Sequence, residues 1–321
     1  MNSNYLFKNN ITISDEVLLW GKGDKNNQKI PKIIWIYWDP LVASPLVEIC
    51  INKIKLLHRD YEVNILNKTN LKDYLPEIVP QRRDLPFANY SDIIRLELLY
   101  TYGGIWIDAS TLITEKIDWI LENNYQDVDV IGFYADFVTK NKSFPILETW
   151  FIATSKQNKF IKSWLYEYKE CYMSDNPSAY FQEIKDNQDW VQGIDAELAD
   201  YLICYLAAIK IIRTNNNYRL LMHSANASAH YYNFGLKLKP HQLCKVFLFN
   251  RAQQTPPKMI KFERRGREAI DLAIYRGQYT RKSLLFKIAP DPNYLKNKLP
   301  RFFRYVLFIL SNYFSKIKKH K

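Results

Sequence analysis

Residues 90–111 read Tyr-Ser-Asp-Ile-Ile-Arg-Leu-Glu-Leu-Leu-Tyr-Thr-Tyr-Gly-Gly-Ile-Trp-Ile-Asp-Ala-Ser-Thr, and this stretch decides the fold. Its first half predicts a helix, because apolar side chains recur there at helical spacing (Ile93, Ile94, Leu98 and Tyr102). Ser91 is the expected N-cap, since its hydroxyl can accept a backbone N–H that the first turn leaves unpaired. Gly103-Gly104 ends the helix, because glycine reaches positive φ without steric cost. The apolar run 105–107 then predicts a short buried strand that ends at Asp108.

The segments before this unit predict alternating strands and helices. Residues 32–38 form a continuous apolar and aromatic run, which is typical of a buried parallel strand. The pattern continues with a helix at 45–57, a strand at 62–66 and a short helix at 70–75. This order predicts an α/β fold with a mainly parallel sheet and right-handed crossovers. Asp108 would then lie at the carboxyl end of a strand, where open α/β sheets bind ligands.

The remaining segments complete the expected organisation. A lead-in helix is predicted around 15–20, and residues 215–233 are polar enough for an irregular loop that could close over a site. Further elements are expected as strands at 128–134, 147–153 and 245–249 and as helices at 158–172 and 195–211. The predicted domains are an N-terminal lead-in (1–29), a catalytic α/β domain (30–265) and a C-terminal helical region (266–321).

Composition sets the broad class of the protein. Apolar residues make up 47% of the 321 residues, which excludes general disorder. The four cysteines are widely scattered, a pattern that suits reduced thiols in a cytoplasmic protein better than disulfides or a zinc site. The first ten residues lack the apolar core of a signal peptide, and no apolar run reaches the roughly 20 residues of a spanning helix.

The positive charge is concentrated at the C-terminal end. The formal net charge is +12, and residues 295–321 hold eight Lys or Arg with no Asp or Glu. The same segment carries a helical apolar stripe (Phe302, Phe303, Val306, Ile309, Leu310, Tyr313, Phe314 and Ile317). Aromatic and basic residues together predict a helix at 299–321 that lies on an anionic membrane surface, with docking on the domain core as the alternative.

Three charged side chains within 90–111 are the candidate catalytic residues. Asp92 and Arg95 share a helix face, and arginine offers a planar fork suited to phosphate. A surface ion pair is the alternative interpretation of that pair. Asp108-Ala-Ser110 resembles a D-x-D motif whose second acid is serine. One carboxylate with waters and substrate phosphates is a normal shell for Mg²⁺, and Mn²⁺ accepts similar oxygen ligands, with a simple turn-forming aspartate as the alternative.

These residues resemble the signature of the bacterial capsular polysaccharide synthesis glycosyltransferases. The matching pattern is Ser91-Asp-x-x-Arg95 followed by Leu98-Leu-Tyr-x-Tyr-Gly-Gly-Ile-Trp-x-Asp108, and Ile30-Pro-Lys-Ile-Ile-Trp35 is similar to the group's first strand. The group is related to the family 32 sugar transferases and, more distantly, to the clostridial glucosylating toxins. The resemblance implies a Rossmann-like GT-A fold, a nucleotide-diphosphate sugar donor, a divalent cation (Mn²⁺ or Mg²⁺) and transfer with retention of anomeric configuration.

The resemblance also implies roles for individual residues. Asp92 would contact the donor sugar or ribose, Arg95 the sugar or diphosphate, and Asp108 with Ser110 the metal. The other donor-binding candidates are Tyr37, Trp38, Asn67 and Gly104. The acceptor-side candidates are Asp195, Glu197, His223 and His230, for which ordinary helix-start acids and loop histidines are the alternative. No residue is identifiable as a nucleophile, which favours same-face attack.

The expected function is transfer of a sugar to a lipid-linked oligosaccharide in capsular or surface polysaccharide synthesis. The enzyme would be peripheral at the inner, cytoplasmic face of the cell membrane. One alternative is a sugar-phosphate transferase on a similar scaffold. Another is a non-catalytic basic protein that binds anionic surfaces or nucleic acid, although the basic residues gather in an amphipathic tail and argue against a nucleic-acid partner.

Overall fold

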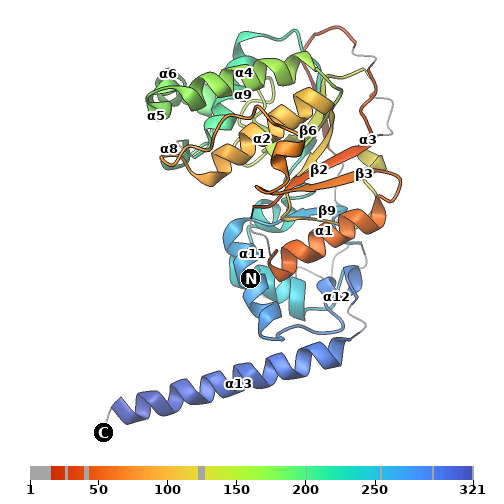
Figure 1. The fold of residues 1–321 in the computed structure, drawn as a ribbon, viewed down its shortest axis with the longest axis vertical. Helices are drawn as coiled ribbons and strands as arrows, with labels where there is room; N and C mark the ends of the chain where they lie inside the picture. Colours follow the sequence, from red (N-terminus) through yellow and green to blue (C-terminus); the bar gives the residue numbers. More distant parts are fainter. Residues whose placement is uncertain are drawn as a thin grey trace.

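The computed structural model describes residues 16–319 apart from 26–27, 40–42, 122–126, 200, 254 and 291–292. In that part of the chain a seven-stranded sheet forms the centre of the protein (Figure 1). Its order is β1 (Val17–Trp20), β8 (Leu220–Ser224), β6 (Val130–Tyr134), β7 (Leu147–Thr154), β4 (Gly104–Ile107), β2 (Ile33–Tyr37) and β3 (Glu62–Leu66). The pairings make β3, β2, β4, β6 and β8 point one way and β7 and β1 the other, so the predicted mainly parallel α/β sheet is confirmed.

Helices cover both faces of this sheet. One face carries α2 (Phe87–Tyr102), α4 (Lys159–Met173) and α9 (Ile203–Thr214), with α5 (Pro177–Tyr180), α6 (Gln182–Asp186), α7 (Gln188–Val191) and α8 (Ala196–Ala199) beyond them. The other face carries α1 (Pro45–Leu57) and α3 (Asp118–Leu121), and the 3₁₀ turn η1 (Leu71–Asp73) follows β3. The longer helices α1, α2, α4 and α9 bury apolar side chains toward the core, which is the usual way an α/β core is closed.

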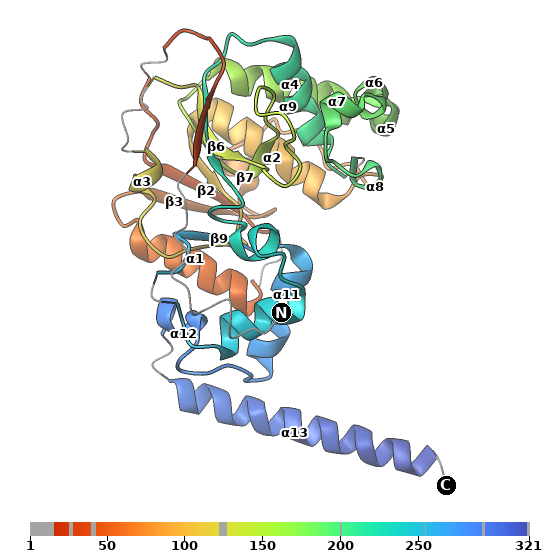
Figure 2. The same cartoon turned by 180° about the vertical axis from the view of Figure 1, so that it is seen from behind.

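A third layer packs against the outer side of α1. Val47 and Ile51 of α1 face the sheet, whereas Leu46 and Cys50 face the other way, into a separate apolar cluster. That cluster is built from the antiparallel pair β5 (Thr111–Ile113) and β9 (Met259–Lys261), the π-helices η2 (Tyr231–Gly235) and η3 (Lys245–Phe249), α10 (Pro240–Cys244), α11 (Arg264–Tyr275) and α12 (Leu284–Ile288). Figure 2 shows β9 between the central sheet and α11. The 111–113 and 259–261 strands therefore join the sheet to the third layer.

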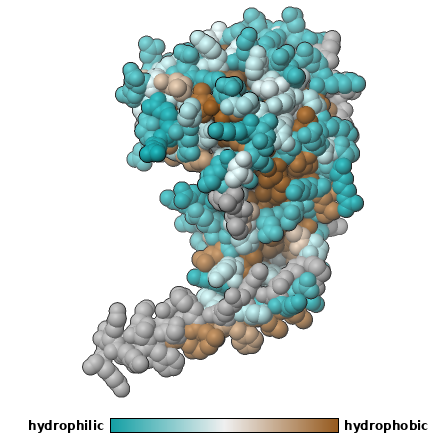
Figure 3. Space-filling model, viewed as in Figure 1, coloured by the Kyte–Doolittle hydropathy of each residue, from teal (hydrophilic) through white to brown (hydrophobic). Residues whose placement is uncertain are grey.

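The helix α13 (Tyr294–Lys319) leaves this layer and projects from the body of the protein (Figure 1). Its first turn is fixed by Tyr294 and Lys298, whose hydroxyl and ammonium groups donate to the Tyr279 carbonyl at 3.0 and 2.8 Å. Exposed apolar side chains line its described part (Leu295, Leu299, Phe302, Phe303, Leu307, Ile309 and Leu310). Figure 3 shows hydrophobic surface at this lower end of the molecule. The C-terminal helical extension is confirmed. The part of the predicted apolar stripe that falls in 311–321 lies outside the residues whose side chains are described.

Several local predictions are wrong. The segment 17–20 is an edge strand paired antiparallel with β8, because the sheet offers more backbone bonds than one isolated helical turn. The expected loop 215–233 contains β8 for the same reason. The helix expected at 195–211 is interrupted, giving α8 and α9. The apolar run 245–249 is a π-helix buried in the third layer, and short apolar runs do not distinguish a strand from a buried helix.

The start of α2 also differs from the prediction. The helix begins at Phe87, after Pro86, so Ser91 lies in its second turn and is not the N-cap. The earlier start is explained by Phe87, whose ring stacks on that of Tyr37 with 5.8 Å between centroids. Asp92 is therefore a buried side chain within the helix, and its charge needs a partner other than the helix N-terminus.

Candidate active site

The helix α2 brings Asp92 and Arg95 to the carboxyl end of β4. The two residues lie one turn apart on the same buried face, and Arg95 donates from Nη1 to Asp92 Oδ1. Nη2 of the same guanidinium donates to Asp108 Oδ1 at 3.0 Å. Only 4% of the Arg95 side chain is exposed, so this is a buried three-residue ion cluster. The fold brings the three candidate catalytic residues together. Asp92 and Arg95 are buried, so the alternative interpretation as a surface ion pair is wrong.

The Gly103-Gly104 turn sets the distance between α2 and β4. Both glycines have positive φ, at +69° for Gly103 and +97° for Gly104. The indole N–H of Trp35 donates to the Gly103 carbonyl at 2.9 Å, and a Cβ on Gly104 would lie 2.6 Å from the Ile33 carbonyl oxygen. A Cβ on Gly103 would lie 2.6 Å from the Lys156 backbone nitrogen, so a side chain at Gly103 would displace the backbone just after β7 and one at Gly104 would displace β2. Gly104 therefore acts through packing, and the contact with a donor is a prediction.

Asp108 is the centre of the hydrogen-bond network. Its Oδ1 also accepts from the Trp106 indole N–H at 2.8 Å, and its Oδ2 accepts from Lys261 Nζ at 2.9 Å. Burial by itself would raise the pKa of Asp108, but the charges of Lys261 and Arg95 outweigh it and lower the pKa to about 2. For Asp92, burial dominates and raises the pKa to about 6, with Arg95 opposing the rise. Both carboxylates are thus ionised at neutral pH.

Lys261 bridges Asp108 and Ser110. Its ammonium donates to Asp108 Oδ2 and, at 2.8 Å, to Ser110 Oγ. The backbone of Lys261 is held by the β5–β9 pairing, in which it lies opposite Thr111, and by an N–H bond of 2.8 Å to the Ala229 carbonyl. The next residue, Phe262, donates its N–H to the Ser110 carbonyl at 3.0 Å. The ammonium is therefore positioned by backbone pairing and not by a flexible loop.

A second buried group lies next to this cluster. Glu148, near the start of the antiparallel strand β7, accepts a 2.7 Å bond from the Tyr205 hydroxyl and is 2% exposed. Burial raises the pKa of Glu148 to about 8. His230 Nε2 lies 3.6 Å from Glu148 Oε1, and burial, helped by the charge of Lys261, lowers the pKa of His230 to about 3. At neutral pH the acid is mostly protonated and the imidazole is neutral.

The donor-binding candidates Tyr37, Trp38 and Asn67 lie at the carboxyl ends of β2 and β3, on the same sheet edge as Asp108. The Trp38 ring lies 5.0 Å from the Arg267 guanidinium, and its buried indole N–H has no hydrogen-bond partner among the described residues. Asn67 Oδ1 accepts from the backbone N–H of Thr69 at 2.8 Å, which makes it a turn former. The sheet edge thus offers an aromatic side chain with an unused donor beside the ion cluster.

The sequence of the chain matches a known family. The family profile described as "Capsular polysaccharide synthesis protein" matches residues 9–184, which is more than half of the 321 residues. The chain belongs to this family. Within it, the sheet order and the position of Asp108 at the end of β4 confirm the GT-A-type fold that the resemblance implied.

Curated relatives are glycosyltransferases. O-glycosyltransferase braB of Annulohypoxylon truncatum is 30% identical over 158 residues, covering 44% of this chain and 38% of that protein. Glycosyltransferase afumC of Aspergillus fumigatus (strain CBS 144.89 / FGSC A1163 / CEA10) is 36% identical over 75 residues, covering 23% and 19%. The chain therefore spans less than half the length of these relatives.

Solved structures of glycosyltransferases resemble the chain more weakly. PaToxG glycosyltransferase matches with a TM-score of 0.31 at 15% identity, covering 61% of this chain and 80% of that one. Galactosyltransferase LgtC, solved with donor and acceptor sugar analogues, matches with a TM-score of 0.39 at 10% identity, covering 83% and 100%. Both scores lie below 0.5, so the fold assignment rests on the sheet and the family.

The acceptor-side candidates of this capsular polysaccharide synthesis family member are dispersed. Asp195 and Glu197 are exposed at α8, where Asp195 Oδ1 accepts the Glu197 N–H at 3.0 Å. His223 is buried in β8, with its ring 5.2 Å from that of Trp119. Of these four, His230 lies 3.6 Å from Glu148, and the pKa values of both groups respond to the charge of Lys261.

Lys261 and Glu148 are functional candidates that the sequence did not reveal. Each comes from a strand far from residues 90–111 in the chain, and neither belongs to a recognisable motif. A signal was present for Glu148, which is the one charged residue in the apolar run 144–153. A charge inside a buried strand needs a partner or a function, so that position could have been selected. Lys261 offered no comparable signal.

The residues at Asp108 and Ser110 do not fit the expected divalent cation. Mg²⁺ requires oxygen ligands at roughly 2.0–2.1 Å in octahedral geometry. Here both Asp108 oxygens accept bonds from Arg95, Trp106 or Lys261, and the ammonium of Lys261 occupies the space between the carboxylate and the Ser110 hydroxyl. Among the described residues, no group of three or more His, Cys, Asp or Glu side chains could hold a metal ion.

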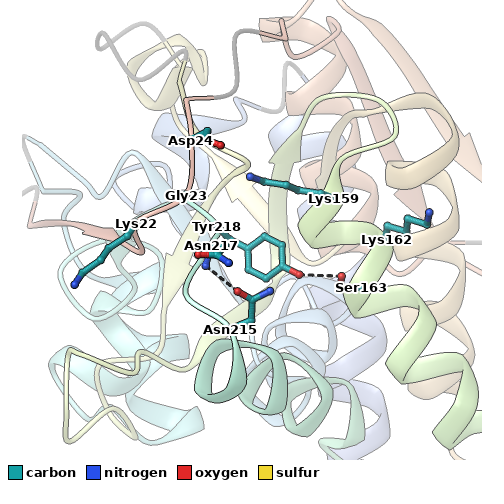
Figure 4. A pocket seen from close by; sticks show the side chains of 9 residues that line it. All are labelled: Lys22, Gly23, Asp24, Lys159, Lys162, Ser163, Asn215, Asn217 and Tyr218. Carbon is teal, nitrogen blue, oxygen red and sulfur yellow. Dashed lines mark hydrogen bonds between the residues drawn. The ribbon is translucent and has the colours of Figure 1, made fainter.

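An open pocket of about 540 Å³ lies elsewhere, at the opposite edge of the sheet (Figure 4). Tyr218, just before β8, crosses this pocket and bonds to Ser163 of α4 at 2.9 Å between their hydroxyl oxygens. The parallel strand β8 begins at Leu220, so the pocket faces the amino ends of the strands. It is basic through Lys22, Lys159 and Lys162, but it is remote from the carboxyl edge that holds Asp108.

Proposed function

We propose that the protein is a glycosyltransferase that moves a sugar from a nucleotide-diphosphate donor to a glycan acceptor. The observation that carries the proposal is the cluster of Asp92, Arg95, Asp108 and Lys261 at the carboxyl edge of a GT-A-type sheet, in a member of the capsular polysaccharide synthesis family. Guanidinium and ammonium groups held by buried carboxylates are suited to a diphosphate. The buried indole N–H of Trp38 has no hydrogen-bond partner among the described residues, which suits it to the donor base or ribose.

Transfer with retention of configuration by same-face attack is part of this proposal. The acceptor hydroxyl oxygen would bond to the anomeric carbon on the face that the diphosphate leaves, and the hydroxyl proton would pass to the departing diphosphate oxygen. This route needs no enzyme nucleophile. Asp92 is held in an ion pair by Arg95, which suits it to orienting sugar hydroxyls better than to attacking carbon. The anomeric configuration of the product, read by proton NMR, tests this step.

The enzymatic proposal is tested with a panel of nucleotide sugars. The protein should release nucleoside diphosphate slowly from one donor, and Asp108→Asn should reduce that release by about 100-fold or more, as expected for loss of a group that orients transition-state donors. Asp84→Asn is the matched control, because Asp84 pairs with Arg82 at the surface. Release of a nucleoside monophosphate would favour a sugar-phosphate transferase instead. No turnover of any donor with any extracted lipid acceptor would contradict both.

We further propose that the acceptor is lipid-linked and that the enzyme works on the inner face of the cell membrane. Support comes from α13, whose described part exposes large apolar side chains, and from free cysteines, which suit a reducing compartment. None of the described helices is both long enough and apolar enough to cross a bilayer. The helix would therefore lie along the surface, aided by the basic residues of 295–321.

Vesicle flotation tests the membrane proposal. The full chain should float with anionic vesicles and less with zwitterionic ones, whereas deletion of 299–321 should abolish flotation and leave donor hydrolysis intact. A charge-preserving control replaces Phe302, Phe303 and Leu307 with serine, which separates the apolar contribution from the electrostatic one. Loss of donor hydrolysis together with binding would instead favour a protein whose activity is binding alone.

A further inference from the structure

The ammonium of Lys261 occupies the position between Asp108 and Ser110 at which the D-x-S motif would hold a cation. Nζ is 2.9 Å from Asp108 Oδ2 and 2.8 Å from Ser110 Oγ. We propose that Lys261 supplies the positive charge that stabilises the leaving diphosphate, so that binding and turnover of the donor need no divalent metal. The proposal rests on the proposed transferase function and adds to it the identity of the electrophilic group.

The charges around Lys261 leave part of its charge available to a ligand. Asp108 is the one carboxylate in an ion pair with Lys261, and it is shared with Arg95, which also pairs with Asp92. The four charges balance, but the ammonium has only part of one carboxylate. Ser110 is a neutral acceptor, whereas a second aspartate there would neutralise the ammonium. Ser110, which replaces the second aspartate of the D-x-D motif, is therefore compatible with the Lys261 ammonium between positions 108 and 110.

Lys261 also has the donor capacity and the access that the role requires. An ammonium carries three N–H groups, and bonds to Asp108 and Ser110 account for two of them. Its side chain is 12% exposed and that of Asp108 is 25% exposed, so the cluster opens to solvent at one side. The third N–H can therefore donate to a phosphate oxygen that approaches from that side.

The backbone around Lys261 is fixed before any ligand arrives. β9 is paired with β5, which follows Ser110 directly, and the Asn233 amide donates to the Lys261 carbonyl at 3.0 Å. Lys261 and the Asp108–Ser110 segment are thus held by two neighbouring strands of one small sheet. Preorganised donors aimed at developing charge provide much of the rate enhancement of enzymes, because they need no reorganisation during the reaction.

The step that Lys261 would assist is cleavage of the bond between the anomeric carbon and the diphosphate oxygen. The electron pair of that bond passes to the diphosphate oxygen as the acceptor oxygen bonds to the carbon. Lys261 donates a hydrogen bond to the diphosphate and keeps its own proton. The proton released by the acceptor hydroxyl goes to the diphosphate, so charge and atoms balance without a further reactant.

Calorimetric titration with inorganic pyrophosphate in excess EDTA tests the binding part directly. Wild-type protein should bind pyrophosphate, and Lys261→Met should weaken that binding about 10- to 100-fold, the usual effect of losing a charged hydrogen bond. Lys258→Met is the matched control, because Lys258 precedes the same strand and pairs with Glu115 near the surface at 3.3 Å. Thermal melting checks that Lys261→Met is folded. If Lys261→Met does not fold, Lys261→Arg, which keeps the positive charge, is titrated in its place. Equal pyrophosphate affinity in the folded Met variant overturns the proposal, as does a requirement of the wild type for Mn²⁺.

A second measurement converts the site to the metal-dependent form. The double variant Ser110→Asp, Lys261→Ala restores two acids and removes the ammonium, so it should bind Mn²⁺, seen as loss of the free-ion signal in electron paramagnetic resonance. Wild-type protein should leave that signal unchanged. Tight Mn²⁺ binding by the wild type would show that the ammonium is displaced by metal and would contradict the proposal.

Turnover distinguishes failure of this proposal from failure of the proposed function. With an active donor, wild-type release of nucleoside diphosphate should be the same within about twofold in EDTA and in Mn²⁺. Release that vanishes in EDTA and returns with Mn²⁺ leaves the transferase function intact and overturns the role of Lys261. No release under either condition contradicts the transferase, and pyrophosphate binding still decides whether Lys261 is an anion-binding residue.

Discussion

Replacing Glu148 with glutamine should flatten the dependence of stability on pH. The Glu148 carboxyl is 2% exposed, and burial raises its pKa from 4.5 to about 8 in the folded protein. Between these values the folded protein keeps a proton that the unfolded chain has lost. The contribution of the protonated acid is therefore fully present below pH 4.5 and is lost as the pH rises through about 8.

The pH range 6.5 to 8.5 spans the titration of the Glu148 carboxyl in the folded protein. Stability can fall by up to about 1.4 kcal/mol per pH unit for one such proton, which gives a loss of about 2 kcal/mol across this range. Asp92, with its pKa raised to about 6 by burial, contributes little above pH 6.5. His230, with its pKa lowered to about 3 by burial, contributes stability that is gained as the pH rises from about 3 through 6.5 and is complete about one unit above 6.5. Burial also lowers the pKa of His58 and raises the pKa values of the four cysteines, and these groups titrate alike in wild type and variant. The difference between the wild-type slope and the Glu148→Gln slope therefore belongs to Glu148.

Urea unfolding at pH 6.5, 7.5 and 8.5, followed by tryptophan fluorescence, measures the slope. The wild type should lose about 2 kcal/mol more unfolding free energy across the series than Glu148→Gln, because glutamine has no proton to release. Glu62→Gln, at an exposed position of β3, is the control that should keep the wild-type slope. A Glu148→Gln variant with the wild-type slope, or a wild type that gains stability with pH, would refute the reasoning.

Two further predictions concern the α2–β4 unit. Arg95→Met should lower the unfolding free energy by about 3–5 kcal/mol, because it leaves the buried Asp92 carboxylate unpaired and removes one of the two cations on Asp108. Arg264→Met, in the exposed pair with Glu268, should leave the urea midpoint unchanged. Gly104→Ala should lower it by about 1–3 kcal/mol, because an alanine at φ +97° is strained and its Cβ would meet a backbone oxygen. Wild-type urea midpoints for either α2–β4 variant would contradict the proposed packing.

The sequence predicted those parts of the fold that local patterns control. The predicted helix 45–57 and strand 62–66 coincide with α1 and β3, since their apolar periodicity matches the faces they bury. Asp92, Arg95 and Asp108 were correctly grouped because helix periodicity, a glycine stop and a short strand place all three within one local unit. Local reasoning was therefore sufficient for the carboxylates and the guanidinium.

The rest of the site depends on pairing between distant segments. Lys261 reaches Asp108 through the β5–β9 pair, and Glu148 reaches the same edge because β7 runs antiparallel to β4. Strand pairing over such sequence separations leaves no local pattern, and three-residue strands carry little periodicity. The start of α2 was misplaced for a related reason, since the ring of Phe87 is fixed by Tyr37, fifty residues earlier in the chain.

Desolvation connects the two buried groups that the sequence did not reveal. At neutral pH, Asp92 and Asp108 are ionised and balance Arg95 and Lys261, while burial keeps most of Glu148 protonated. An ionised Glu148 would add a negative charge beside Lys261 and reduce the charge that Lys261 offers to a diphosphate, because Coulomb interactions are strong where water is excluded. The burial of Glu148 at the start of β7 thus keeps this acid neutral and leaves the positive charge of Lys261 undiminished. The pH dependence of stability and the anion affinity of Lys261 are therefore consequences of the same burial.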